Sequence, residues 1–147
     1  MAYSGRYKPK NTKKYEGNPS AIKYRSLWER QAFKWCDGNP SIIGWSSEEV
    51  VVGYRCQTDN KMHRYFVDLF IRMKDGKCYL IEIKPKAQTL PPKQKSRKSK
   101  KYLREVMTYG KNQSKWKAAT AFAHKRGMIF QVWTEETLKG LGIKLLT

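Results

Sequence analysis

The sequence YLIEIKPK, residues 79–86, decides the fold of this chain. Its leucine and isoleucines favour a pleated strand that is at least half buried. Glu82 and Lys84 nevertheless interrupt the apolar run, and charged groups are rarely buried unless they are paired or bind a metal. The stretch therefore predicts a buried strand in which something compensates a carboxylate and an ammonium group.

The turn before this strand determines which side chains share a face of the sheet. We predict an antiparallel hairpin in which a strand over residues 65–72 pairs with one over residues 77–84. A two-residue loop, Asp75-Gly76, would place Asp68 opposite Ile83 and would mix charged and apolar residues on both faces. This register is therefore disfavoured.

A three-residue loop, residues 74–76, gives the register that sorts the two faces. With Gly76 in the left-handed conformation, it sets Asp68 opposite Glu82 at a Cβ separation of roughly 4.5–5.5 Å. One face then holds apolar residues throughout: Tyr65, Val67, Leu69, Ile71, Tyr79, Ile81 and Ile83. The other face gathers Asp68, Glu82 and Lys84 beside Phe66, Phe70 and Leu80. Two carboxylates that face each other repel unless something neutralises them.

A divalent cation would remove this repulsion. Mg²⁺ is commonly bound by one or two carboxylates together with water and phosphate oxygens, and Mn²⁺ can take the same place. Lys84, two residues beyond Glu82 and on the same face, can contact a scissile phosphate or the attacking water. The alternative is a surface salt bridge on an exposed sheet face, which the aromatic and aliphatic neighbours disfavour. The pattern predicts a metal site without a small-molecule cofactor.

The composition points to a polyanionic partner. The chain has 147 residues, with 31 Lys and Arg against 12 Asp and Glu, and its formal net charge is +19. A basic balance of this size is typical of proteins that bind nucleic acid. Such a balance can also serve solubility or binding to an acidic protein. The charge alone therefore does not establish a nucleic-acid partner, and a functional site must support that interpretation.

The cysteines and histidines indicate no metal centre of their own. Cys36, Cys56 and Cys78 form no CxxC pair, and His63 and His124 have no zinc-ligand spacing around them, so structural zinc is not expected. No segment approaches the roughly 18 apolar residues of a membrane span. We expect a soluble protein of a reducing compartment with no membrane partner.

The periodicity of the chain predicts one domain, residues 26–147, preceded by a basic arm. Residues 1–25 mix lysines and tyrosines without a hydrophobic period, so we expect them to be extended and loose. The elements expected in the domain are a helix over 26–37, strands near 50–54, 65–72 and 77–84, helices ending near 109 and over 114–126, a strand over 128–133 and a short last helix. This order is α/β, and the last strand should cross over to join the sheet.

Asp68, followed after thirteen residues by Glu82-Ile83-Lys84, resembles the motif of the PD-(D/E)xK nuclease superfamily, with Val67 in the place of the Pro. The resemblance implies a restriction-endonuclease-like α/β core, a mixed sheet of about four strands flanked by helices. It also implies that Asp68 and Glu82 ligate the metal together with the carbonyl of Ile83. Lys84 would position water or phosphate.

Further short motifs extend over nearly the whole chain. They are Ala2-Tyr3-Ser4-Gly5, Tyr24-Arg25-Ser26 with Trp28-Glu29, Trp45 with Ser47-Glu48, Arg64-Tyr65-Phe66 with Asp68, residues 81–86, residues 115–119 and Lys125-Arg126-Gly127. Together they resemble the family of head completion nucleases of large contractile-tailed phages and, more distantly, the TnsA-type transposon-end endonucleases. The resemblance implies a Mg²⁺-dependent DNA endonuclease that acts on phage heads around the end of DNA packaging. Its expected place is the cytoplasm of the infected bacterial host or the phage head, with head, portal or neck proteins as partners.

Two further acidic residues are candidates for the site. Glu29 matches the helix carboxylate that many members of the superfamily place beside the metal, as a ligand and catalytic residue. The alternative is local, because Ser26 and Glu29 have the spacing of a capping box in which Glu29 bonds back to the Ser26 amide. Glu48, at a strand entry, is more often a solvated residue.

Basic side chains are expected to contact the phosphates of DNA. They are Lys8, Lys10, Lys13 and Lys14 of the arm, together with Lys86 and Lys115. The alternative function is a non-catalytic basic head or neck protein that binds DNA or portal components. Among enzymes the rival is a junction resolvase, which would need a stable dimer that the sequence does not indicate. The DNA form that is cut, the oligomeric state and the role of residues 93–101 are left open.

Overall fold

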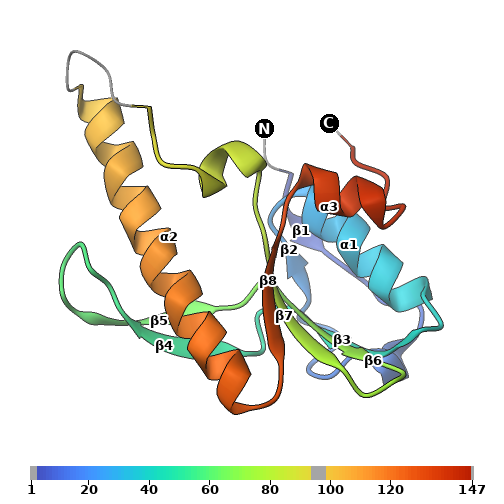
Figure 1. The fold of residues 1–147 in the computed structure, drawn as a ribbon. Coiled ribbons are helices and arrows are strands. Elements are labelled where there is room, and N and C mark those ends of the chain that lie inside the picture. Colours follow the sequence, from blue (N-terminus) through green and yellow to red (C-terminus); the bar gives the residue numbers. More distant parts are fainter. Residues whose placement is uncertain (1–2, 94–98, 147) are drawn as a thin grey trace.

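A mixed sheet of four strands forms the centre of the computed structural model, which describes residues 3–93 and 99–146 (Figure 1). In spatial order its strands are β3 (Ile42–Ser46), β6 (Leu69–Met73), β7 (Cys78–Ile83) and β8 (Ile129–Trp133). The first three are antiparallel neighbours, and β8 runs parallel to β7. The predicted α/β class with a mixed sheet, and the crossover of the last strand, are confirmed.

Helices cover both faces of this sheet. They are α1 (Leu27–Gly38), α2 (Lys100–Lys125) and α3 (Glu135–Gly140). α1 and α3 lie on one side of the sheet and α2 lies on the other (Figure 1). Among the described residues, no helix is both long enough and apolar enough to cross a bilayer.

The strand β3 lies where the sequence predicts none. Ile42 and Trp45 are buried in it, but its pairing with β6 shifts register between Ile42 and Gly44. This irregularity breaks the alternation of apolar and polar residues by which a strand is recognised in a sequence. The strand predicted near residues 50–54 is present, but the neighbour of β6 in the central sheet is β3.

A second sheet of two strands stands beside the central one. β4 (Val51–Arg55) and β5 (Met62–Phe66) pair antiparallel, and β4 packs against α2. The sequence predicts one strand over residues 65–72, which is wrong because the chain changes sheets between β5 and β6. Asp68 lies in this break.

The β6–β7 hairpin has the register that the sequence predicts. Gly76 has a φ of +93°, and its N–H donates to the carbonyl of Met73 at 3.0 Å. The N–H of Met73 donates to the carbonyl of Lys77 at 2.8 Å, which closes the three-residue loop. The ladder keeps this register, and its continuation sets Asp68 across from Glu82.

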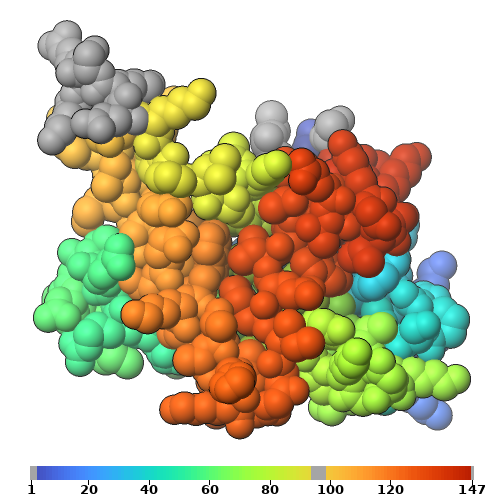
Figure 2. All heavy atoms as spheres, viewed as in Figure 1, coloured from blue at the N-terminus to red at the C-terminus, as the bar shows by residue number. Residues whose placement is uncertain are grey.

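The two faces of the central sheet carry separate apolar cores. Leu69, Ile71 and Ile81 are buried on the side of α1. Phe70 and Leu80 are buried on the side of α2, against residues of α2 and β4. The face that holds Glu82 is therefore covered by α2 and the second sheet, and in Figure 2 the atoms of α2 and β8 lie directly beside one another.

Tyr65 and Val67 do not lie on the face that the sequence predicts for them. Both belong to the core on the α2 side, whereas the predicted alternation assigns them to the α1 side with Leu69. The alternation fails because the chain changes sheets at Asp68, and the period of two holds only within one continuous strand.

The N-terminal residues are packed against the domain, so the prediction of a loose, extended arm is wrong. β1 (Gly5–Arg6) pairs with β2 (Lys23–Tyr24), and the short turn η1 (Thr12–Lys14) lies between them. Tyr15 and Ile22 are buried in the core on the α1 side. Scattered tyrosines and one isoleucine supply enough apolar surface to hold the segment without any regular period.

Lys14 fixes this segment to the end of α1. Its Nζ donates to the carbonyl oxygens of Cys36, Asp37 and Asn39 at 2.8, 3.0 and 2.8 Å. The last carbonyls of a helix lack partners within the helix, and the negative end of the helix dipole favours a cation. Lys14 therefore caps the helix from a distant part of the chain.

α2 is one helix of 26 residues, where the sequence predicts two. Gly110 lies inside it because this position needs close packing: a Cβ there would lie 2.9 Å from Nε2 of Gln57. Gln57 belongs to the β4–β5 connection, and its N–H donates to Oγ of Ser114 at 3.1 Å. The helix is thus anchored on the second sheet.

Candidate active site

Glu82 is a buried carboxylate in β7 that is held by two neutral donors. Only 5% of the residue is exposed. Its Oε2 accepts hydrogen bonds from the hydroxyl of Tyr65 in β5 and from Nε1 of Trp116 in α2, both at 2.8 Å. Burial, followed by the charge of Glu82, raises the pKa of the Tyr65 hydroxyl, so Tyr65 remains a donor. The buried charge of Glu82 is therefore stabilised in part by hydrogen bonds from two aromatic residues in other elements.

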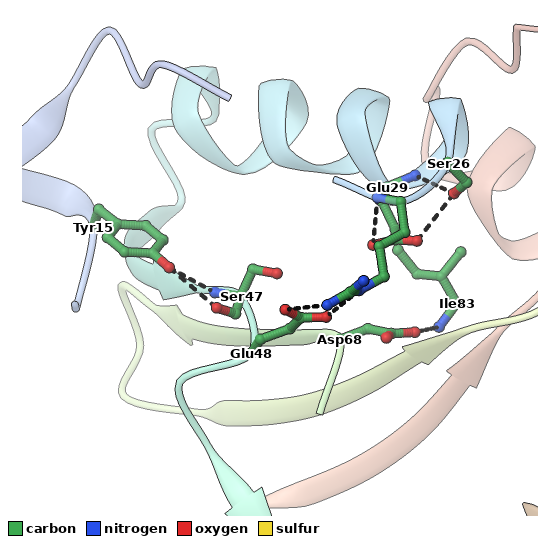
Figure 3. Close-up of polar contacts among 8 residues, drawn as sticks. Tyr15, Ser26, Glu29, Ser47, Glu48, Asp68 and Ile83 are labelled. Atoms are coloured by element: carbon green, nitrogen blue, oxygen red, sulfur yellow. Dashed lines mark hydrogen bonds and ion pairs between the residues drawn. The ribbon is translucent and has the colours of Figure 1, made fainter. Parts of the chain in front are cut away.

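Asp68 lies beside Glu82 at the end of the neighbouring strand. Its Oδ2 accepts a hydrogen bond from the N–H of Ile83 at 2.9 Å (Figure 3). Burial, followed by the charge of Glu82, raises the pKa of Asp68 well above its usual value. Burial also acts to raise the pKa of Glu82, but interactions with Asp68, Trp116 and the charge of Lys84 outweigh it and lower that pKa. In the metal-free pair a proton is therefore held more tightly by Asp68 than by Glu82, and the two side chains hydrogen-bond to each other.

The donor set of this pair fits a small, hard divalent cation. Asp68 and Glu82 each have one oxygen engaged by protein donors. Apart from the hydrogen bond between the two carboxyl groups themselves, no N–H or hydroxyl group of residues 3–93 and 99–146 donates to the other oxygen of either carboxylate. Carboxylate oxygens, with a nearby carbonyl such as that of Ile83, are the ligands that Mg²⁺ prefers.

Two lysines lie beside the carboxylates. Lys84 follows β7 directly, and its N–H donates to the carbonyl of Trp133 at 3.0 Å. Nζ of Lys115 stands 5.3 Å from the ring centre of Tyr65. Burial lowers the pKa of Lys115, while the charge of Glu82 acts in the opposite direction. The sequence predicts a phosphate contact for Lys115, and the structure brings this residue to the site itself.

Glu29 lies in the first turn of α1 and takes part in capping this helix. Its N–H donates to Oγ of Ser26 at 3.3 Å, and Ser26 Oγ donates to Oε2 of Glu29 at 3.1 Å (Figure 3). The expected bond from the Ser26 amide is replaced by one from the Arg25 N–H, at 3.4 Å. Burial raises the pKa of Glu29, and its charge in turn raises the pKa of Asp68. Glu29 can thus help to cap α1 and lie near the site at the same time.

Arg25 and Glu48 complete the polar residues on this side, and no role is predicted for Arg25 from the sequence. Glu48 has a φ of 58°, which is uncommon for a residue with a side chain. The Nε and Nη2 of Arg25 donate to its two carboxylate oxygens at 2.8 and 3.3 Å (Figure 3). The bond to Glu48, followed by the charges of Glu29 and Asp68, raises the pKa of Arg25. The guanidinium thus faces three carboxylates at once.

The predicted DNA-contacting lysines differ in their surroundings. Lys8, Lys10 and Lys13 are exposed, whereas the ammonium of Lys14 is turned toward the end of α1. Lys86 forms an exposed ion pair with Glu136 at 3.1 Å. Of the open segment 93–101, residues 94–98 lie outside the described part of the chain.

A separate group of metal-ligand residue types lies in the β4–β5 hairpin. The ligand atoms of Cys56, Asp59 and His63 lie within 4.8 Å of one another, although the spacing in the sequence predicts no zinc ligands there. Nε2 of His63 and Oδ2 of Asp59 are 2.7 Å apart, and Cys56 Sγ is 3.0 Å from Oγ1 of Thr58. These contacts close the turn without an ion, so we interpret the group as a structural feature of the hairpin.

A family model described as "TnsA-like endonuclease N terminal" matches residues 39–135. This range includes Asp68, Glu82 and Lys84, while Glu29 precedes it. The head completion nuclease of Enterobacteria phage T4 is 45% identical to this chain over 148 residues, which cover 98% of this chain and 99% of that relative.

Proposed function

The chain belongs to the family of TnsA-like endonucleases, and from this we propose that it is a Mg²⁺-dependent DNA endonuclease that acts in phage head completion. The observation that carries the proposal is the buried pair Asp68 and Glu82. Each carboxylate is held by N–H or hydroxyl donors through one oxygen, and a cation would replace the hydrogen bond that joins the two carboxyl groups. The relative from phage T4 supports the place of the reaction in head completion.

The cation would be held by Asp68, Glu82 and the carbonyl of Ile83, with Glu29 adjoining them. Mg²⁺, or Mn²⁺ in its place, would supply positive charge at the scissile phosphate and lower the pKa of a water molecule. The buried surroundings strengthen these interactions, because charges act over a lower dielectric constant there than in water. The chain itself must then place the DNA backbone against this group.

Two ammonium groups of the chain would bind the reacting phosphate. Lys84 lies two residues beyond Glu82 in the sequence, and Lys115 reaches the same region from α2. Positive charge at these positions stabilises the phosphate most when its charge increases during the displacement. Lys84 is assigned the position nearer to the phosphate or the attacking water, and Lys115 a phosphate contact beside it.

The remaining basic surface would hold the rest of the DNA. Exposed cations from two segments surround one hollow, which is lined by Arg6, Lys8, Lys10, Arg30 and Lys34 with Tyr7 and Tyr24. Phosphate contacts of this kind bind and orient DNA without reading its sequence. We propose that Lys8, Lys10, Lys13 and Lys86 act in this way, in the cytoplasm of the infected host and at the phage head, with head or portal proteins as partners.

The test is incubation of the purified protein with branched, linear and circular DNA, with and without Mg²⁺. We expect Mg²⁺-dependent cleavage of at least one form that disappears in Asp68→Asn and Glu82→Gln. Asp75→Asn, in the exposed β6–β7 turn, is the matched control and should cleave normally. Absence of cleavage on every form, or undiminished cleavage by Asp68→Asn, would sink the proposal; absence together with DNA binding would favour the non-catalytic head protein.

A further inference from the structure

The two donors that hold Glu82 come from parts of the chain that are far apart. Tyr65 belongs to β5 of the second sheet, and Trp116 belongs to α2. Both donate to the same oxygen, Oε2, at 2.8 Å. A carboxylate oxygen has two lone pairs, so these two bonds use the acceptor capacity of Oε2.

The consequence is an asymmetry between the two oxygens of Glu82. In the part of the chain that the structure describes, no N–H or hydroxyl group donates to Oε1, and the further hydrogen bond of Glu82 is the one with the neighbouring Asp68 carboxyl group. Both donors of Oε2 are uncharged, so they fix the carboxylate without neutralising it. A lysine or arginine in their place would compete with a cation for the negative charge.

From this geometry we propose that Tyr65 and Trp116 are positioning residues, which hold Glu82 so that it binds the catalytic cation through Oε1 alone. The inference deepens the proposed function and rests on its metal site. Groups that orient a metal ligand from behind determine both its direction and its affinity. Their effect should therefore appear in metal binding before any DNA is present.

Both aromatic residues are themselves held in place. Tyr65 is only 3% exposed and pairs with Val52 across the β4–β5 ladder. Trp116 follows Ser114, whose hydroxyl accepts from the N–H of Gln57 at 3.1 Å. The second sheet and α2 are thus fixed to each other next to the two donors, which limits the movement of Glu82.

The experiment measures Mn²⁺ binding from the loss of the free-ion signal in electron paramagnetic resonance. It compares the wild type with Tyr65→Phe, which removes one hydroxyl, and Trp116→Phe, which removes the indole N–H. Tyr54→Phe on the same hairpin and Trp35→Phe, which packs on Trp133, are the matched controls. Circular dichroism and thermal unfolding show that each variant is folded; if Trp116→Phe is not, Tyr65→Phe alone decides.

We expect each site variant to bind Mn²⁺ about tenfold more weakly, as is usual when the group behind a ligand is lost, and the controls to bind like the wild type. In a Glu82→Gln background, Tyr65→Phe should weaken residual binding no further. Wild-type affinity in folded Tyr65→Phe and Trp116→Phe would overturn the inference and leave the metal site intact. Undiminished binding in Asp68→Asn and Glu82→Gln, or none in the wild type, would overturn the metal site and the inference with it.

Discussion

Asp68 holds its proton more tightly in the folded chain than in the unfolded one. Its raised pKa comes from burial and then from the charge of Glu82. Such a group contributes stability that is fully present below its unfolded pKa and is lost as the pH rises through the folded pKa. Glu82, whose pKa is lowered, acts in the opposite sense, and its contribution is lost only as the pH falls through its folded value.

The metal-free protein should therefore lose unfolding free energy as the pH rises from about 4 through the raised pKa of Asp68. Asp68→Asn removes the ionisable group. The unfolding free energy of this variant should therefore change less with pH, and it should exceed that of the wild type at the upper end of the pH range. Urea unfolding in the presence of EDTA at a series of pH values measures the effect. Asp75→Asn should keep the wild-type slope, and an equally steep slope in Asp68→Asn would contradict the assignment.

Lys84 should affect the chemical step far more than DNA binding. One phosphate contact among many is a small part of the affinity, whereas a charge at the reacting phosphate acts mainly in the transition state. Lys84→Ala should therefore bind DNA nearly like the wild type and cleave it roughly 10²–10³ times more slowly. Lys84→Arg should not restore the rate, because the planar guanidinium does not replace a compact ammonium group.

Binding for this comparison is measured by fluorescence anisotropy with Ca²⁺, which has looser coordination geometry than Mg²⁺ and should support binding better than cleavage. The rate is measured in single turnovers with Mg²⁺. Lys74→Ala, an exposed cation in the β6–β7 turn, is the charge-matched control. Equal losses in affinity and rate would assign Lys84 to general DNA binding.

The N-terminal segment and α1 should unfold together, because Lys14 joins them. Lys14→Ala removes three hydrogen bonds at the end of α1, although the carbonyls of Asp37 and Asn39 keep a second donor, and we expect a loss of about 1–3 kcal/mol in unfolding free energy. Lys13→Ala, one residue away and exposed, should change stability little. Urea unfolding of both variants tests this, and equal stabilities would mean that the segment does not support the helix.

The elements show where sequence patterns predict structure and where they do not. The β6–β7 register follows from local information, since Gly76 and the alternation on either side specify one loop and one pairing. The face of Tyr65 could not be predicted, because the change of sheets at Asp68 depends on tertiary packing. Gly110 looks like a helix end in the sequence and is instead a contact with another element.

The same distinction holds for the site. Asp68, Glu82 and Lys84 share one hairpin, so a short motif predicts that they lie together. Trp116 gave no chemical signal, because an indole in a helix usually belongs to a core, and only the folded chain brings it to Glu82. Arg25 likewise reaches Glu48 across 23 positions of sequence. Hydrogen-bond partners that come from distant elements can be identified only in the three-dimensional structure.

The excess of positive charge across the molecule should appear in the salt dependence of DNA binding. Each lost phosphate contact lowers the slope of log K against log salt by up to roughly 0.9 for duplex DNA. The triple variant of Lys8, Lys10 and Lys13 to alanine should therefore have a clearly shallower slope, with unchanged sequence preference. Lys74→Ala with Lys77→Ala, in the β6–β7 turn, is the control, and an unchanged slope in the triple variant would remove these lysines from the DNA surface.

The long-range bonds to Glu82 also determine when the nuclease can become active during its synthesis. A growing chain carries Asp68, Glu82 and Lys84 well before it contains Trp116 or the parallel neighbour of β7, strand β8. Contacts between residues distant in sequence form late, because a long loop must close before they are gained. The hairpin can therefore assemble early with its carboxylates uncommitted, and the orienting bond from α2 forms only when the last third of the chain has been made. A ribosome-bound or truncated fragment would hold the whole proposed catalytic motif and still lack the hydrogen bond from Trp116 that orients Glu82.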